Sequence, residues 1–499
     1  MPVNIPCKEY VENTHPWKVV RDCVDGEISI KNAGEIYLSR LPDQSDQDYE
    51  AYKARPKFFD GTSRTAEGLH GHIFAKAPVQ NGETSEAFKE LLKNVDGSGT
   101  SIDKFSDNVT WDAMQTNWGG ILVDHTSVEE GTSKAESKAR AYMKWYKAED
   151  VIKWRYSVVN GISKLTLVIL REDQEKENPD DEFDTIITEA YRVLSFDEDG
   201  DYIQRLFVKD EKADNGFTEN APIYAKIDGE NLKEIPFFTC PGEIPEKSML
   251  LGMAFVNIGH YQKSADYENA LHFTGCPTPI AVNMQQPLDK NKNPIKIRLG
   301  SACFQFFYGG PNSNVDVKFL EFNGAGLEHS RNGLNDELDK MAKLGIQSIG
   351  PEKKAVETAE VASIHRSAEN GLLGAFAKSM SDKITQAVRL MAKWNNITEA
   401  DDWSYELNNN FDHKDISNQI LQIMHSARMS GEIPRSAWFA FLKKNGMLPD
   451  EIKTLDDFLQ ELEKDAVNHG THGDDDDAQD AKNGEKTSAV DVYDLGGEK

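Results

Sequence analysis

Two pairs of neighbouring titratable residues have the types that metal binding or acid–base catalysis would need. His70 and His72 flank Gly71, but two positions apart on a helix they face different ways, and no cysteine lies nearby in sequence. Asp124 and His125 end the apolar run ILVDH and could form half of an acid–base pair, yet no nucleophile motif accompanies them. We therefore expect surface or capping histidines, and no metal site.

The sequence lacks the short motifs that usually carry enzymatic chemistry. It contains no G-x-x-x-x-G-K-[ST] loop, no G-x-G-x-x-G following a strand, no G-x-S-x-G and no H-E-x-x-H. Glu357 and Glu360 lie one turn apart where a long helix is expected to begin, and there they favour the positive end of the helix dipole. We interpret them as capping residues and predict a protein that is not an enzyme and needs no cofactor.

Basic residues gather at two places in an otherwise acidic chain. Lys353 and Lys354 lie in a loop between two expected long helices, and a second group lies in a β-rich segment: Lys290, Lys292, Lys296 and Arg298. Two interpretations stay open for both groups. Each is either a solvated loop, or a place of intermittent contact with phosphates or with a docking partner.

The overall charge excludes one class of function. The 499 residues include 56 Lys and Arg against 84 Asp and Glu, a net charge of −28. A protein that wraps tightly around duplex DNA must neutralise phosphates, and this composition argues against that, although not against a surface that DNA slides past. From Thr471 onward nine acids face three lysines, which predicts a disordered, solvated tail, with a docking segment as the alternative.

Cysteine usage and hydropathy predict a soluble intracellular protein. The five cysteines show no CxxC spacing, which fits a reducing compartment. No apolar stretch is long enough to span a membrane, and no apolar run follows the first residues as it would in a secretory signal.

The periodicity of apolar residues predicts an α+β protein. Residues 44–116 favour helices, and residues 139–239 alternate with period two around an Asn160-Gly161 turn, which favours an antiparallel meander that ends with IPFFTC. A helix over 249–275, a β-like module over 277–325 and a second helix from 326 follow, before Gly350-Pro351.

The last part of the chain is predicted to be helical. A long amphipathic helix runs to Trp394, with Gly371 and Gly374 marking a bend or a close packing contact. Two or three short helices are expected between Asp412 and Ala466.

This order of elements, together with several segments, resembles the portal (head-to-tail connector) proteins of tailed bacteriophages. The segments are RTAEGLHGHIFAKAP, WRYSVVNGISKLTLVILRE with YRVLSF, NIGHYQKSADYENALHFTGCPTPIAVN, FNGAGLEHSRNGLNDELDKMAKLGIQSIG and ETAEVASIHRSAENGLLGAFAKSMSDKITQAVRLMAKW. The resemblance covers roughly residues 45–465 and is weakest for the first 40 residues and the tail.

The resemblance implies a portal-like fold divided into named parts. These are a mixed α/β wing with an antiparallel meander (1–248), a two-helix stem (249–275 and 326–349), a small α/β clip (276–325), a tunnel loop (350–356), a long wing helix with its connection (357–410), a helical crown (411–470) and a disordered acidic tail (471–499).

The resemblance also implies function and partners. Portals form rings, typically of twelve copies, at one capsid vertex of the virion, and they assemble in the host cytoplasm. Double-stranded DNA passes non-specifically through the ring, which docks the terminase large subunit and head–tail adaptors and contacts the major capsid and scaffolding proteins, with no membrane involved. The implied channel residues are Glu352, Lys353 and Lys354, and the implied docking residues of the clip are Lys290, Lys292, Lys296 and Arg298.

The charge agrees with such a channel. Twelve copies at −28 each carry −336, and a largely acidic wall would repel phosphates while Lys353 and Lys354 make a few reversible contacts. Two alternatives remain: another capsid or head–tail adaptor protein without a DNA channel, and an enzyme whose site has no recognisable motif.

Overall fold

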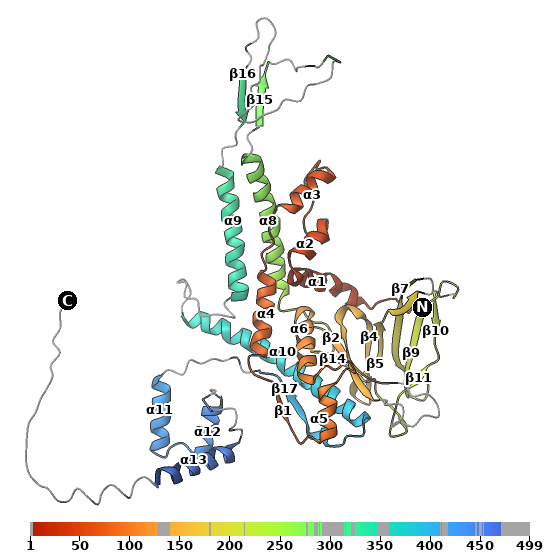
Figure 1. Cartoon of the computed structure of the whole chain (residues 1–499), viewed down its shortest axis with the longest axis vertical. Helices are drawn as coiled ribbons and strands as arrows, with labels where there is room; N and C mark the ends of the chain where they lie inside the picture. The colour runs from red at the N-terminus through yellow and green to blue at the C-terminus, as the bar shows by residue number, and fades with distance from the viewer. Residues whose placement is uncertain are drawn as a thin grey trace, which may run out of the picture. The chain divides into compact units, whose positions relative to one another are not determined.

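The computed structural model describes residues 3–126, 140–178, 181–213, 215–275, 278–283, 288, 290–291, 314, 316–320, 325–346, 359–409, 411, 418–444, 447–448, 452 and 454–470. The chain forms two compact units, Met1–Phe411 and Asp412–Lys499. The first unit combines helices with antiparallel sheets (Figure 1), so the predicted α+β class is confirmed.

Helices dominate the first part of the chain. Three of them begin at a serine whose side chain accepts a hydrogen bond from a backbone N–H of the first turn, namely Ser45, Ser85 and Ser101. The helices are α1 (Lys8–Asp25), α2 (Glu27–Ala33), η1 (Gly34–Ile36), α3 (Asp46–Ala54), α4 (Gly61–Ile73), α5 (Glu86–Lys93) and α6 (Ile102–Thr116).

A three-stranded antiparallel sheet follows these helices. It consists of β2 (Gly119–His125), β3 (Ala141–Lys147) and β14 (Phe237–Cys240), in the order β14-β2-β3. The expectation that the segment ending in IPFFTC completes the meander is wrong for β14, which pairs with β2 instead. The reason is burial: β2 is buried on both faces, and its central position requires a strand on each side.

The meander forms a separate six-stranded sheet in the order β10-β9-β8-β5-β4, with β11 also paired to β9. Asn160 and Gly161, both at positive φ (55° and 79°), form the tight turn between β4 and β5, as the sequence predicts. The strands are β4 (Val151–Val159), β5 (Ile162–Arg171), β8 (Ala190–Phe196), β9 (Tyr202–Lys209), β10 (Phe217–Glu219) and β11 (Ile223–Tyr224).

Smaller hairpins and connections complete the sheets. The segment between β5 and β8 forms a hairpin that was not predicted from the sequence. Its strands are β6 (Gln174–Asn178) and β7 (Asp181–Thr188). The other short pairs are β12 (Lys226–Ile227) with β13 (Glu230–Asn231), and β1 (Val79–Asn81) with β17 (Ser404–Glu406). Two single 3-10 turns are η2 (Ala148–Asp150) and η4 (Glu399–Asp402).

Two helices run side by side and form a hairpin (Figure 1). They are α8 (Leu251–Gly275) and α9 (Ala325–Met341), and α9 continues into a π-helical turn, η3 (Ala342–Ile346). Between them in sequence lies an antiparallel pair, β15 (Thr278–Val282) and β16 (Asp316–Leu320). The structure therefore has helices where the sequence predicts them over 249–275 and from 326.

The longest helix, α10 (Ala359–Trp394), packs on the three-stranded sheet. Its buried residues recur every three or four positions: Phe376, Met380, Ile384, Val388 and Met391. A Cβ at Gly374 would lie 3.1 Å from the carbonyl oxygen of Asn409, so Gly374 marks a close packing contact, whereas a Cβ at Gly371 would meet open space.

The described residues of the second unit form three helices, α11 (Asn418–Met429), α12 (Arg435–Lys444) and α13 (Leu455–Gly470). Phe439 and Phe458, whose ring centroids are 5.5 Å apart, join α12 to α13. The acidic tail from residue 471 lies outside the described residues.

Candidate functional site

The structure describes few of the residues expected to contact DNA or partners. Glu352, Lys353 and Lys354 lie outside the described residues, and so do Lys292, Lys296 and Arg298. Lys290 is described, and it lies exposed in a turn. The two basic groups therefore remain predictions, and the site that can be built is the helix hairpin from which both basic segments extend.

A charged contact holds the two helices of the hairpin together. The Lys263 ammonium on α8 donates to Glu337 on α9, and Lys340 lies 3.1 Å from the same carboxylate. Glu337 is 7% exposed. Its hydrogen bond with Lys263 keeps the pKa of Glu337 below its ordinary value, with Lys340 adding to the effect against the opposing influence of burial. Glu337 is therefore ionised and paired at neutral pH.

Buried hydrogen bonds seat the first half of α8 in the body of the unit. The Asn257 side chain, which is fully buried, accepts from the backbone N–H and the hydroxyl of Thr62 at 3.0 Å and donates to the carbonyl oxygen of Phe59 at 2.7 Å. Because a lost partner would leave a buried amide unpaired, Asn257 fixes α8 against the start of α4.

Further along α8 the contacts come from the preceding helices. Gln262 donates to the carbonyl oxygen of Tyr37 at 2.7 Å, and the Tyr52 hydroxyl donates to Asp266 at 2.6 Å. These positioning residues were not identified from the sequence. Their partners lie about two hundred positions away, and the available signal was the polar interruption of the apolar pattern in 249–275.

The hairpin and α10 also expose large apolar side chains. Phe255 is 50% exposed, Leu344 48% and Leu372 67%, and Leu271 also faces solvent. Scattered exposed apolar residues are common in proteins; here two of the four lie on α8, one on the η3 turn and one on α10. Such faces are suited to contact with another protein surface.

The charge on the hairpin does not suit tight binding of nucleic acid. The described residues of α8, α9 and η3 contain four basic and six acidic side chains. Glu328, Asp336 and Asp339 on α9 are exposed. A protein that grips a phosphate backbone presents a basic stripe, and the described helices of this hairpin carry none.

The two histidines considered for metal binding serve different packing roles. His70 stacks edge-on against Trp111, and its Nε2 lies 3.1 Å from Oδ1 of Asp107, while burial lowers the pKa of His70. His72 instead packs against Phe411. In the described part of the chain, no three His, Cys, Asp or Glu side chains gather in a way that could hold a metal ion.

Asp124 and His125 do not form an acid–base pair with each other. Asp124 is buried and accepts from Arg192 and from Gln204, both at 2.9 Å, whereas His125 Nδ1 lies 2.7 Å from the carbonyl oxygen of Thr126. Neighbouring residues on a strand point to opposite faces, which separates the two side chains.

Arg192 extends this network to a second carboxylate. Its Nε lies 2.6 Å from Glu172, which also pairs with Lys144. Burial alone would raise the pKa of Glu172, but Arg192 and Lys144 hold it below its ordinary value. The network therefore ties β2 and β3 to β8 and β9, and joins the two sheets.

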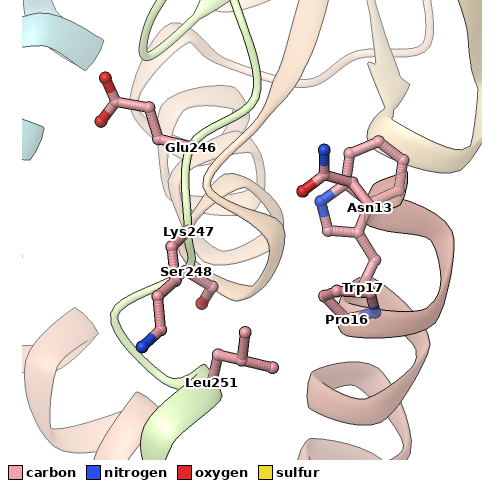
Figure 2. A pocket seen from close by; sticks show the side chains of 7 residues that line it. All are labelled: Asn13, Pro16, Trp17, Glu246, Lys247, Ser248 and Leu251. Carbon is pink, nitrogen blue, oxygen red and sulfur yellow. The ribbon is translucent and has the colours of Figure 1, made fainter. Parts of the chain in front are cut away.

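A small cavity of about 230 Å³ lies between α1 and the segment that leads into α8. Figure 2 shows Asn13, Pro16 and Trp17 on α1 facing this segment, with the Glu246 carboxylate directed away from α1. Trp17 Nε1 is buried without a hydrogen-bond partner among the described residues. The lining does not bring together a nucleophile, a base and an orienting acid.

The described chain is thus an α+β protein built around a helix hairpin that is firmly seated at one end. The family described as "Domain of unknown function (DUF4055)" matches residues 249–395, which run from α8 to the end of α10. No curated protein matches the chain. The chain is similar to a solved chain described as "Neck of empty GTA particle computed with C6 symmetry", with 12% identity, coverage of 84% of this chain and 99% of that chain, and a TM-score of 0.36. Among the described helices, none is long and apolar enough to cross a membrane.

Proposed function

We propose that this chain is a portal-type subunit, many copies of which form a ring at one capsid vertex and surround a channel for DNA. The observation that carries the proposal is the hairpin of α8 and α9, which is closed by a β-containing insert and followed by the long helix α10. This is the order of stem, clip, stem and wing helix that the sequence resemblance implies.

Exposed apolar side chains on the same helices support assembly into a ring. A monomer would leave Phe255, Leu344 and Leu372 in water, whereas contact with a neighbouring copy would bury them. A head-to-tail contact that repeats with a closing rotation generates a ring.

The charge distribution supports a channel through which DNA slides. The hairpin has no basic excess, and the whole chain carries −28. Repulsion between an acidic wall and phosphates keeps the DNA from adhering, and Lys353 and Lys354 of the proposed tunnel loop supply brief, reversible contacts.

The insert between α8 and α9 is the proposed docking platform. Lys290 is exposed there, and Lys292, Lys296 and Arg298 belong to the same segment of the sequence. Four cations so close together in the sequence suit an acidic surface on the packaging terminase or on a head–tail adaptor.

Negative-stain microscopy and native mass measurement of the purified full chain test the proposal. We expect rings with a central hole, and a compact monomer would overturn the proposal. A closed assembly without a hole would favour the alternative of a capsid or adaptor protein without a DNA channel. Phe255→Glu is expected to reduce ring formation, whereas Val158→Glu, at a more exposed apolar side chain on β4, serves as the control.

A further inference from the structure

The six-stranded sheet carries apolar side chains on both faces. Val168, Leu170 and Leu194 belong to the main core, whereas Ile169 and Val193 belong to a separate small cluster on the opposite face. Of the partly buried side chains that pack against this cluster in the described residues, only Val3 and Tyr10 come from outside the sheet. An antiparallel sheet with a free face normally carries polar side chains there, so this outer face has the composition of a covered surface.

The outer face contains a hollow of about 310 Å³ that is lined by apolar side chains, two cations and Asn215. The apolar lining residues are Val3, Leu167, Ile169, Val193, Phe207 and Phe217, and the cations are Lys153 and Arg205. The Lys153 ammonium has no ion-pair partner among the residues that the structure describes. Arg205 Nε is buried and has no hydrogen-bond partner among the described residues. Arg205 Nη1 lies 3.9 Å from Glu219. This hollow suits an apolar side chain that is accompanied by carboxylates.

A surface with those properties lies on the β6–β7 hairpin. Phe183 is 91% exposed and Ile187 65%. Because side chains alternate along a strand, Phe183 and Ile187 lie on one face of β7, and the residue paired with Ile187 on β6 is Glu175. Thr185 of the same face pairs with Glu177. One face of the hairpin therefore presents two large apolar side chains and two acids.

β6 and β7 form a two-stranded sheet of their own. Within the described residues, β6 and β7 pair only with each other. An isolated two-stranded hairpin is marginally stable in water, and a Phe side chain held almost fully in solvent adds nothing to its stability. Both facts indicate a surface that is completed by a partner.

We propose that the β6–β7 hairpin of one copy docks in the hollow on the sheet of the neighbouring copy. Phe183 would enter the hollow and contact its apolar lining, while Glu175 and Glu177 would face Lys153 and Arg205. The two surfaces lie at different places on each copy, so the contact is head-to-tail and repeats around a ring. The inference rests on the proposed ring, and it names the contact that sets the order of the subunits.

Disulfide cross-linking between two variants of the full chain, each with one introduced cysteine beside the five native ones, tests this contact. One variant carries Phe183→Cys, and the other carries Asn215→Cys in the exposed turn at the edge of the hollow. Because each variant provides half of the bond, a new product that requires both variants must join different copies. We expect a cross-linked dimer in the mixture after mild oxidation, absent from either variant alone and reversed by a reductant.

The outcomes separate this inference from the proposed function. Rings by microscopy without a cross-link in the mixture overturn the docking contact and leave the ring intact. A bond that forms in the double variant F183C/N215C as a monomer, but not in the mixture, also overturns it, because the hairpin would then fill the hollow of its own chain. A monomeric protein without rings overturns the proposed function and this contact with it.

A charge-reversal series provides the second measurement. Lys153→Glu is expected to lower the yield of the cross-link by about tenfold, because like charges placed opposite each other disfavour an interface. Lys153→Glu in the variant that carries Asn215→Cys is then combined with Glu177→Lys in the variant that carries Phe183→Cys. This pair should restore the yield of the cross-link, whereas no restoration is expected if Lys153 has only a structural role. Lys164→Glu, at an exposed lysine of β5, is the matched control. Equal yields for Lys153→Glu and Lys164→Glu would contradict the proposal.

Discussion

Arg21 on α1 donates to Asp112 on α6 across 2.7 Å, although 91 positions separate the two residues. The same guanidinium lies 2.9 Å from Glu149, and the Trp145 indole donates to Asp112 at 2.9 Å. Burial opposes ionisation of Arg21, but its hydrogen bonds to Glu149 and Asp112 keep its pKa above the ordinary value. This contact attaches the first helix of the chain to the helix and sheet that form the centre of the unit.

Removing this guanidinium should destabilise the first unit. Arg21→Ala would leave Asp112 as a largely buried carboxylate without its ion-pair partner, which costs about 3 kcal/mol in the free energy of unfolding. Urea unfolding followed by tryptophan fluorescence would measure the loss. Arg40→Ala removes an exposed Arg from Glu35 and Asp46 and should leave the stability near that of the wild type. Similar losses for both variants would contradict this interpretation of the Arg21 cluster.

Gly120 allows Phe237 of β14 to pack directly on β2. A Cβ at position 120 would lie 2.0 Å from Phe237 Cζ, so Gly120→Ala must displace a buried ring and should cost about 1–3 kcal/mol. Thermal unfolding would measure the change. Gly71→Ala provides the control in α4, because a Cβ there meets nothing within 4 Å and should stabilise the helix by about 0.5–1 kcal/mol. If Gly120→Ala unfolds at the wild-type temperature, the close approach of Phe237 is not required.

Local patterns were sufficient to predict the elements that depend on local chemistry. The Asn160-Gly161 turn needs two residues at positive φ, and the apolar period of α10 reflects one buried face along the helix. Because a glycine in a helix interior is costly, Gly371 and Gly374 predicted a bend or a close packing contact, and the structure has such a contact at Gly374 but not at Gly371.

Long-range pairing could not be predicted in the same way. The residues Phe237–Cys240 do not themselves indicate whether this strand pairs with β2 or with the meander. The choice depends on which sheet has a buried strand that still needs a partner along one edge. The burial of α1 was also missed: Trp17 stacks on Trp118 with ring centroids 6.2 Å apart, and Pro16 within the helix obscured the pattern.

The candidate site shows the same division. The sequence alone indicated the helices of the hairpin, but not the residues that seat them, since Asn257 acquires its role from Thr62 and Phe59. Asp124 looked like a possible acid because Arg192, its ion-pair partner, lies 68 positions away.

Acidification should weaken the first unit through two histidines, of which His260 is buried and His70 is partly buried. Burial lowers the pKa of His260 on α8 from 6.5, against the opposing charge of Glu337, and burial likewise lowers the pKa of His70. As the pH falls below 6.5 the unfolded chain takes up these protons first, so stability is lost until the folded-state pKa values are passed. Unfolding by urea at a series of pH values from 7.5 to 5 would show this decline. His260→Gln should reduce the slope of the unfolding free energy against pH, and adding His70→Gln should reduce this slope further. An unchanged slope in the double variant would contradict the assignment of the decline to these two histidines.

Reversing the charge of the proposed tunnel loop should separate ring assembly from DNA passage. Lys353→Glu combined with Lys354→Glu would remove the expected phosphate contacts from an acidic channel, so packaging should fall while rings still form. The length of packaged DNA and the yield of filled particles, measured beside negative-stain images of the purified rings, would report the two effects separately. Lys164→Glu, on an exposed strand of the meander, changes the net charge by the same amount per substitution and should leave packaging intact. Normal packaging by the Lys353/Lys354 double variant would show that these lysines do not act on the passing DNA.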